Sequence, residues 1–242
     1  MARASVTNHR MPTGPRVRRG YFECRFGQLH MHNAIPPGGG FDEGTALLCL
    51  HPVPRSARMF RAFLPLAGVD RSVYAPDLPG CGESDPPPGR PTVGDYVAAI
   101  GDFLDAMRFK QIDVLGYHAG SLLAAELAVA RPKQVRRVVM VGVPLPTQAE
   151  REALERTVRA SIPPGESAQF VTDLCWPPAD SLDRVTQPVR VLRLKDELWE
   201  LTPRVRERLT RASIVELPEL GSDAFDAAPA KILEAIRDFI QG

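Results

Sequence analysis

The chain has 242 residues, of which 44% are hydrophobic and 24% are charged, and its formal net charge at pH 7 is +1. That composition is typical of a globular protein with an ample core, and α/β chains of this length are routinely a single domain. The small net charge provides no overall field to attract nucleic acid or anionic lipid, and no apolar run approaches the roughly 20 residues that span a bilayer. We therefore expect neither a nucleic-acid partner nor a membrane partner.

The first 19 residues are rich in arginine and contain no acidic residue. A transit peptide has a similar composition, but we interpret residues 1–19 as a disordered basic tail because they lack an apolar stripe. A secretory signal would require an apolar segment that is missing here. The four cysteines are widely spaced, with no C-x-x-C pair, which predicts buried free thiols in a reducing compartment. We therefore expect a cytoplasmic protein.

Residues 20–242 are predicted to form one domain in which strands alternate with helices. Short apolar or β-branched runs are typical of strands, and longer runs with an apolar stripe are typical of helices. The alternation favours a mostly parallel eight-stranded sheet with flanking helices. The expected strands are 21–26, 29–34, 46–50, 72–75, 112–115, 135–143, 189–194 and 213–217, and the expected helices are 57–66, 92–109, 121–130, 202–211 and 227–240.

Residues 145–186 break this alternation. Thr147 and Glu150 have the spacing of a capping box at the start of a charged helix, and proline-rich segments follow. An insertion at the carboxyl edge of a sheet is well placed to cover a pocket, so we interpret the region as a small cap. Trp176, with Phe170 and Leu174, is expected to line that pocket, and the alternative is that these side chains only pack the cap against the domain.

The segment Gly116-Tyr117-His118-Ala119-Gly120 has the spacing of a nucleophile elbow, the strand-to-helix turn that presents a catalytic side chain. Such a turn needs glycine on both sides because its backbone is strained and tightly packed. Both glycines are present, but a histidine stands at the centre, where a serine is usual. The fold is therefore easier to infer than the reaction.

Four features in order resemble the α/β-hydrolase family over roughly residues 45–240. Residues Asp77–Ser84 match the family's D-x-P-G-x-G-x-S loop after the fourth strand, and His51-Pro52 stands where the family has H-G after the third. The elbow follows at the expected distance, and residues 187–240 have the closing strand-helix-strand-helix pattern. The resemblance implies an α/β-hydrolase fold with an atypical G-x-H-x-G elbow.

The resemblance also implies positions for a nucleophile, an acid and a histidine, in that chain order. His118 occupies the nucleophile position, and Asp196, with Glu197 as the alternative, occupies the acid position after the seventh strand. The segment Gly221–Phe225 matches the family's G-H-x-x-F, so Ser222 stands at the histidine position. No histidine follows His118, so these positions cannot assemble an ordinary Ser-His-Asp triad.

Three interpretations stay open. In the first, His118 is itself a general base or nucleophile, and Asp196 orients its ring and stabilises the imidazolium. This would make the protein a cofactor-independent hydrolase or lyase acting on a small organic molecule. In the second, His118 activates the hydroxyl of Ser222. In the third, the protein is not an enzyme, and the pocket of a pseudo-hydrolase serves ligand binding or regulation.

Other residues are assigned from the same resemblance. The backbone N–H groups of Val53 and Ala119 are expected to form an oxyanion hole. His51 and Tyr117 are expected beside the pocket, although a histidine at position 51 also suits a purely structural role. We interpret Ser121 as a helix packing residue.

Ser84 is expected to close the turn that begins at Asp77. His30 and His32 alternate on an early strand and have no evident third ligand, so we expect neither a metal nor a cofactor. The expected partner is a small-molecule substrate or ligand, and the expected state is a monomer or homodimer.

Overall fold

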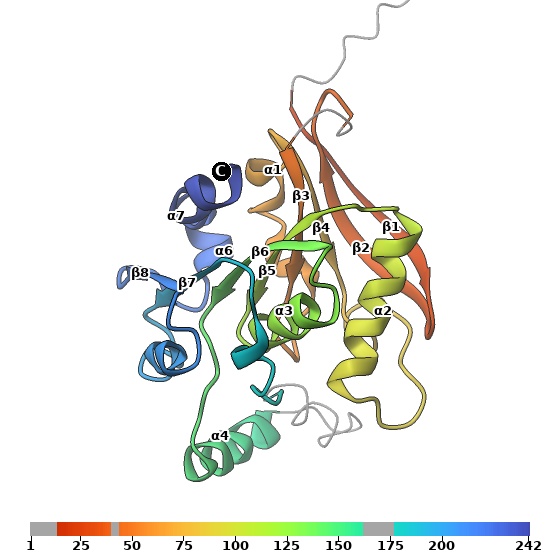
Figure 1. Cartoon of the computed structure of the whole chain (residues 1–242). Coiled ribbons are helices and arrows are strands. Elements are labelled where there is room, and N and C mark those ends of the chain that lie inside the picture. The colour runs from red at the N-terminus through yellow and green to blue at the C-terminus, as the bar shows by residue number, and fades with distance from the viewer. Residues whose placement is uncertain (1–13, 40–43, 162–176) are drawn as a thin grey trace, which may run out of the picture.

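One sheet organises the computed structural model, which describes residues 14–39, 44–161 and 177–242. Within those residues eight strands lie in the order β1-β2-β4-β3-β5-β6-β7-β8 (Figure 1). Strand β2 runs antiparallel to both of its neighbours, and all the other pairs are parallel. The strands are β1 (Arg16–Cys24), β2 (Gly27–Ile35), β3 (Gly44–Leu50), β4 (Arg71–Pro76), β5 (Ile112–Tyr117), β6 (Val135–Val141), β7 (Val189–Leu194) and β8 (Ser213–Leu217).

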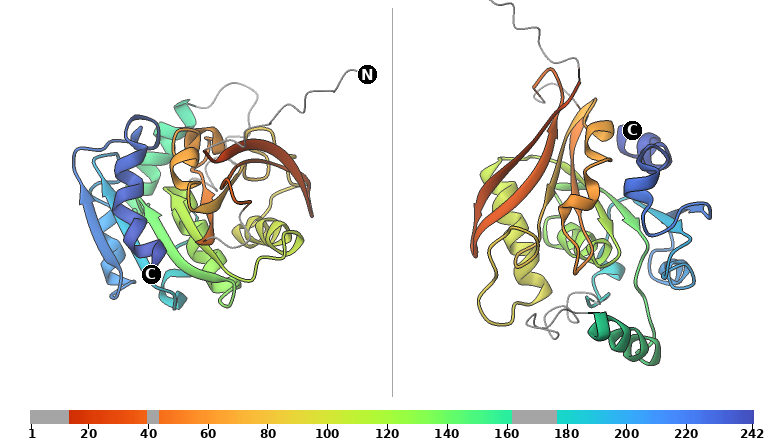
Figure 2. Two further views of the ribbon diagram at one scale, coloured as in Figure 1. Left: turned by 90° about the horizontal axis from the view of Figure 1, so that it is seen from above. Right: turned by 180° about the vertical axis from the view of Figure 1, so that it is seen from behind.

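Helices cover both faces of the sheet, as the alternating sequence predicted (Figures 1 and 2). One apolar core lies under α2 and α3, and a second lies under η1, α1, α6 and α7 on the opposite face. Strands β4 and β5 are buried along their whole length because both cores press on them. The helices are η1 (Ala57–Phe60), α1 (Leu64–Ala67), α2 (Val93–Ala106), α3 (Ala119–Ala130), α4 (Gln148–Ser161), η2 (Leu182–Arg184), η3 (Thr202–Glu207), α6 (Ala224–Ala227) and α7 (Pro229–Gln241).

The predicted fold class is confirmed, and the predicted ends of several elements are wrong. Strand β1 begins at Arg16, inside the predicted tail of residues 1–19, and pairs with β2 from Arg16 opposite Ile35 to Cys24 opposite Gly27. The ladder uses backbone groups only, and an edge strand leaves room for charged side chains to reach solvent. Arginine content therefore does not exclude a strand here.

Two predicted helices are shorter than expected. The helix predicted over 57–66 is instead two short turns, η1 and α1, because Pro65 has no N–H to continue a helix begun earlier. The helix predicted over 202–211 ends at Glu207, and Thr202 is not its N-cap. The Thr202 hydroxyl is buried, where it donates to the Leu198 carbonyl and accepts from the Val143 N–H.

Helix α4 forms part of the predicted cap and stands apart from the helical layers, at the bottom of Figure 1. The predicted capping box is present: the Thr147 N–H donates to Glu150 at 2.7 Å, and the Glu150 N–H donates to the Thr147 hydroxyl at 3.4 Å. Arg204 of η3 donates two hydrogen bonds to Glu150, and this guanidinium lowers the pKa of Glu150 to about 2. The start of the cap is therefore attached to η3.

Asp77 organises the D-x-P-G-x-G-x-S loop. Its Oδ1 accepts from the Ala57 N–H at 2.7 Å, and its Oδ2 accepts from the Glu83 N–H at 3.0 Å. A Cβ atom on Gly82 would lie 2.1 Å from that Oδ2, which explains the glycine. Ser84 donates its hydroxyl to the Asp77 carbonyl at 2.8 Å, so the predicted turn-closing role of Ser84 is confirmed.

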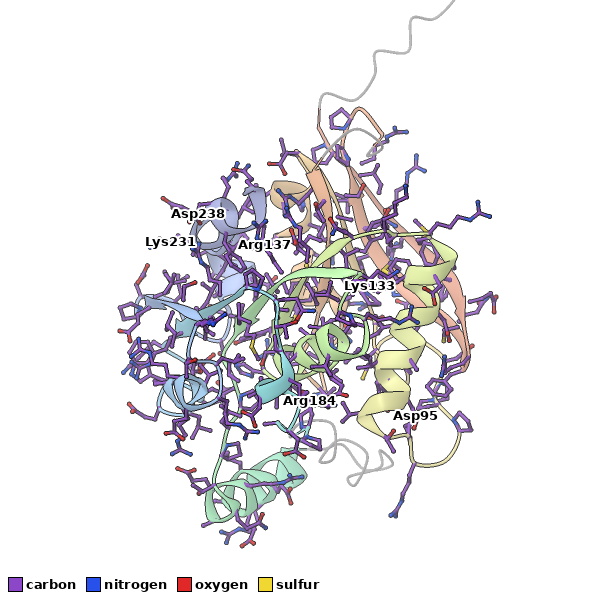
Figure 3. All side chains as sticks on the ribbon, in the orientation of Figure 1. Asp95, Lys133, Arg137, Arg184, Lys231 and Asp238 are labelled. Carbon is purple, nitrogen blue, oxygen red and sulfur yellow. The ribbon has the colours of Figure 1, made fainter. Side chains whose placement is uncertain are left out.

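A buried ion cluster ties the end of α7 to the sheet. Asp113 of β5 has a fully buried side chain and accepts two hydrogen bonds from Arg136, at 2.9 and 2.7 Å. Arg71, which is also buried, lies 3.5 Å from the same carboxylate. Both arginines donate to the Ile240 carbonyl. Arg137 lies over the ring of Phe239 in α7, and Figure 3 labels Arg137 near that helix.

Substitution Asp113→Ala is expected to lower the free energy of unfolding by about 3–5 kcal/mol, because the buried Arg71 would keep only the half-exposed Asp70 as an ion-pair partner. The matched control is Asp105→Ala, which removes an exposed carboxylate paired with Arg131 and is expected to cost less than about 1 kcal/mol. Urea unfolding curves measure both values. Equal losses in the two variants would contradict the stabilising role of the Asp113 cluster.

Candidate active site

His118 lies at the turn between β5 and α3, with φ 49° and ψ −118°. A positive φ is strained for a residue that carries a Cβ atom, and such strain is concentrated at functional turns. Close packing holds the turn in place. A Cβ atom on Gly116 would lie 2.0 Å from the Gly120 carbonyl oxygen, and one on Gly120 would lie 2.2 Å from the Leu50 carbonyl oxygen. Both glycines of the predicted elbow are therefore required.

The turn aims the His118 ring at Asp196, the predicted acid. His118 Nε2 lies 2.9 Å from Asp196 Oδ2, and the Asp196 side chain is fully buried. A carboxylate accepts hydrogen bonds, so Nε2 carries the proton of this contact. The His118 side chain remains 15% exposed, which leaves its ring within reach of a ligand. Two residues 78 positions apart in the chain thus form one dyad.

Asp196 is held by two further donors. The Leu198 N–H donates to Oδ1 at 2.9 Å, and the Tyr117 hydroxyl lies 3.4 Å from Oδ2. Burial, and then the charge of Asp196, raise the pKa of Tyr117, so this hydroxyl keeps its proton. The Tyr117 ring lies 4.0 Å from the His118 ring, measured between centroids. Tyr117 therefore lies beneath the dyad and supports it from the side of the buried core.

Gly142 is a site residue that the sequence reasoning missed. Strand β6 ends at Val141, and Gly142 follows with φ 56°. A Cβ atom there would lie 2.7 Å from His118 Cδ2 and 3.2 Å from Asp196 Oδ2. The absence of a side chain at this position makes room for the dyad. A glycine at the end of a β-branched strand was the available signal, because β-sheet interiors disfavour glycine.

The other nitrogen of the ring faces Glu197, the predicted alternative acid. His118 Nδ1 lies 3.6 Å from Glu197 Oε1, and the Glu197 side chain is 57% exposed. That distance is longer than a hydrogen bond, and an exposed carboxylate interacts weakly with a neighbour. The geometry therefore favours Asp196 as the orienting acid and leaves Nδ1 on the open side.

His118, Asp196 and Glu197 are also the candidate metal ligands among the described residues, with ligand atoms within 4.8 Å of one another. A cation coordinated through Nε2 would replace the hydrogen bond to Asp196. A cation coordinated through Nδ1 would have Glu197 as its nearest carboxylate. Structural zinc sites, by comparison, usually have four protein ligands. The present contacts fit an acid–base pair better than a metal centre.

The structure does not join Ser222 to His118 by a hydrogen bond within the residues it describes. Ser222 is half-buried, and its backbone carbonyl accepts a hydrogen bond of 3.3 Å from the Tyr117 hydroxyl. Ser121, which is buried, donates its hydroxyl to the His118 carbonyl at 2.5 Å. Its predicted role in helix packing is confirmed, since that hydroxyl is already used by the backbone of the turn.

His51 uses both ring nitrogens in hydrogen bonds to the backbone, which fits the structural role predicted as its alternative. Burial lowers the pKa of this fully buried histidine, so the ring is neutral. Its Nδ1 donates to the Pro52 carbonyl at 2.9 Å, and its Nε2 accepts from the Leu78 N–H at 2.8 Å. His51 therefore joins the loop after β3 to the loop after β4.

The residues predicted to form an oxyanion hole follow β5 and β3. Ala119 is the first residue of α3, and the first N–H groups of a helix have no acceptor within it. Val53 is buried in the loop after β3 and precedes a cis peptide bond to Pro54. Trp176, Phe170 and Leu174, predicted to line the pocket, lie outside the described residues.

A cavity of about 470 Å³ lies between the chain that leaves β6 and helix η3. Its lining includes Pro144, two residues beyond Gly142, as well as Thr147 of the cap and Arg204. His118 is not among the lining residues. The cavity therefore lies between the start of the cap and η3.

Substitution Gly142→Ala is expected to disrupt the dyad, because the new Cβ atom would collide with the His118 ring. The matched control is Gly89→Ala: Gly89 also has a positive φ, 68°, but nothing lies within 4 Å of an added Cβ atom. The control is expected to cost about 1–2 kcal/mol of backbone strain, and Gly142→Ala measurably more. Urea unfolding gives the stabilities, and the NMR signal of the His118 Nε2 proton reports the hydrogen bond. An unchanged signal in Gly142→Ala would contradict the contact.

Comparison with known proteins shows which family the fold of this chain resembles. The model of the alpha/beta hydrolase fold matches residues 45–164. A 2-hydroxymuconate semialdehyde hydrolase of Pseudomonas putida is 35% identical over 108 residues, which are 41% of this chain and 37% of the relative. A haloalkane dehalogenase of Mesorhizobium japonicum is 33% identical over 92 residues, 38% of this chain and 30% of the relative. The matched part thus spans about a third of the length of these relatives.

Solved structures extend the likeness to nearly the whole chain. Naproxen esterase from Bacillus subtilis has a TM-score of 0.73 at 18% identity, and the superposition covers 93% of this chain and 92% of the esterase chain. The thioesterase domain from the curacin biosynthetic pathway has a TM-score of 0.68 at 18% identity, and the superposition covers 92% of this chain and 99% of the thioesterase chain. At such identities the likeness shows the fold. Together with the family model, it shows that the chain belongs to the α/β-hydrolase fold superfamily.

Proposed function

We propose that the protein is a cofactor-independent hydrolase or lyase of a small organic molecule, with His118 as the catalytic base and Asp196 as its orienting acid. The observation that carries the proposal is the 2.9 Å contact between His118 Nε2 and the buried Asp196 carboxylate. The curated relatives named as a hydrolase and a dehalogenase support this reaction class. No serine of the described residues takes the place of His118 at the elbow.

The contact assigns a role to each ring nitrogen. Nε2 donates its proton to Asp196, so a neutral His118 has a free electron pair at Nδ1, on the half-open side of the ring. Nδ1 can take a proton from substrate or from water, and the resulting imidazolium is stabilised by the adjacent carboxylate. The same nitrogen can then return the proton to the leaving group. Direct attack of Nδ1 on the substrate is the nucleophilic form of this chemistry.

The backbone supplies a second element of the proposed mechanism. Negative charge that develops on a substrate oxygen is stabilised by N–H groups already aimed at it. The N–H of Ala119, at the start of α3, is the first proposed donor, because it follows the base directly and has no acceptor within the helix. The N–H of Val53 is the second. Both suit an enolate or a tetrahedral intermediate.

Substitutions His118→Ala and Asp196→Asn test the proposed dyad. A cell extract is incubated with each variant, and metabolites are compared by mass spectrometry. We expect a substrate that the wild type consumes, a rate about 10²–10⁴-fold lower in His118→Ala, and a smaller loss in Asp196→Asn. Glu200→Gln is the control, because Glu200 is a strongly exposed acid of the same loop. A substrate consumed equally by wild type and His118→Ala would disprove the role of His118.

The competing candidate is a non-catalytic ligand-binding or regulatory protein. Two observations favour it: the elbow has no serine, and Ser222 makes no hydrogen bond to His118 within the described residues. In that case the extract experiment yields a ligand that copurifies with the protein unchanged. Turnover that depends on His118 would exclude this candidate.

A fluorophosphonate probe tests whether any serine is activated. Such a probe reacts with a serine hydroxyl deprotonated by a neighbouring base. We expect no labelling of the wild type, because the Ser121 hydroxyl is used by the backbone and Ser222 is not bonded to His118. Labelling that disappears in Ser222→Ala, but not in Ser121→Ala, would instead support the pair in which His118 activates Ser222. A commercial serine esterase serves as the positive control.

A further inference from the structure

A second cavity, of about 470 Å³, lies at the edge of the sheet formed by β1 and β2. Strand β2 is separated from β5, which carries the elbow, by β4 and β3 (Figure 1). The cavity therefore does not belong to the candidate active site. Its lining combines the edge hairpin with η1 and consists of Val17, Arg18, Arg19, His32, Arg58 and Arg61.

The strand register explains how these residues meet. Arg19 and His32 are directly opposite each other in the antiparallel β1–β2 pair, so their side chains share one face of the hairpin. Val17 lies on the same face, two residues before Arg19. Arg58 and Arg61 come from η1 and the residue that caps it. Four cationic or imidazole side chains from three elements thus surround one space, and Arg18 completes the lining although its side chain belongs to the other face of β1.

The charge of the cavity is only partly balanced by the protein. None of the lining residues is acidic, although the whole chain has a net charge of only +1. Arg58 is paired with Glu83 at 2.9 Å, whereas Arg18, Arg19 and Arg61 form no ion pair with any carboxylate of the described residues. Guanidinium groups held together repel one another, and a bound anion would remove that cost.

His32 adds a polar atom that has no partner. The side chain is buried, with 5% of the residue exposed, and its Nε2 makes no hydrogen bond to the described residues. A buried polar nitrogen without a partner is costly and rare in folded proteins. The neighbouring His30 cannot supply the bond through its Nδ1, because that atom is bonded to Asp77 at 2.9 Å. An oxygen of a ligand in the cavity would satisfy His32.

We propose that this cavity binds the phosphate group of a small phosphate monoester. Guanidinium groups match phosphate oxygens with paired N–H donors, and a tetrahedral phosphate has enough acceptors for Arg19, Arg61 and His32 together. The cavity volume exceeds that of a phosphate ion and lies in the range of small-ligand pockets. Val17 and the exposed Tyr21 ring, on the same face of β1, provide an apolar surface for the organic part of the ester.

Isothermal titration calorimetry with phenyl phosphate, in buffer with physiological salt, tests the proposal. We expect saturable binding to the wild type, with inorganic phosphate binding more weakly because it lacks the ring. Arg19→Gln and Arg61→Gln are each expected to weaken binding about tenfold or more. Both residues are exposed and make no ion pair with the described carboxylates, so these variants are expected to fold. His32→Phe is expected to weaken binding while it keeps an aromatic ring at that position.

The matched control is Arg206→Gln, which removes one exposed positive charge away from the cavity. It is expected to leave the affinity for phenyl phosphate unchanged. Absence of saturable binding, or equal weakening in Arg206→Gln and Arg61→Gln, would overturn the proposal. Binding to vesicles that contain phosphatidic acid, without binding of phenyl phosphate, would also overturn it, because the anion would then be a lipid headgroup.

Discussion

The hydrogen bond between His118 and the buried Asp196 carboxylate is the contact on which the site depends. A carboxylate removed from water needs donors, and Asp196 has three: the His118 ring, the Leu198 N–H and the Tyr117 hydroxyl. A different part of the fold positions each donor. The histidine is placed by the elbow, the amide by the loop after β7, and the phenol by the last residue of β5.

That contact explains why the strained turn persists without a serine. His118 keeps a positive φ because the glycines on either side pack against backbone, and Gly142 leaves space for the ring. An imidazole is longer than a hydroxymethyl group, so it reaches the acid without an intervening residue. A histidine at the elbow is therefore held by a direct contact with the acid.

The sequence predicted well those elements whose signal lies in their own residues. The buried strands β3 to β7 were predictable because apolar runs bounded by turns mark them, and the elbow was predictable because its glycines have fixed spacing. The start of β1 and the role of Thr202 were not. In both cases backbone partners far along the chain decide the structure: β2 pairs with Arg16–Arg19, and Val143 donates to the Thr202 hydroxyl.

The sequence alone determined the fold family, the elbow and the absence of any histidine after His118, because these depend on residue types and their order. It left Asp196 and Glu197 as alternative acids. Only the tertiary structure decided that Nε2 rather than Nδ1 contacts Asp196, that Gly142 makes room for the ring, and that His51 is fully used by backbone. It also brought His32 and the arginines of η1 to one cavity. Such facts depend on distances between segments that local sequence patterns do not encode.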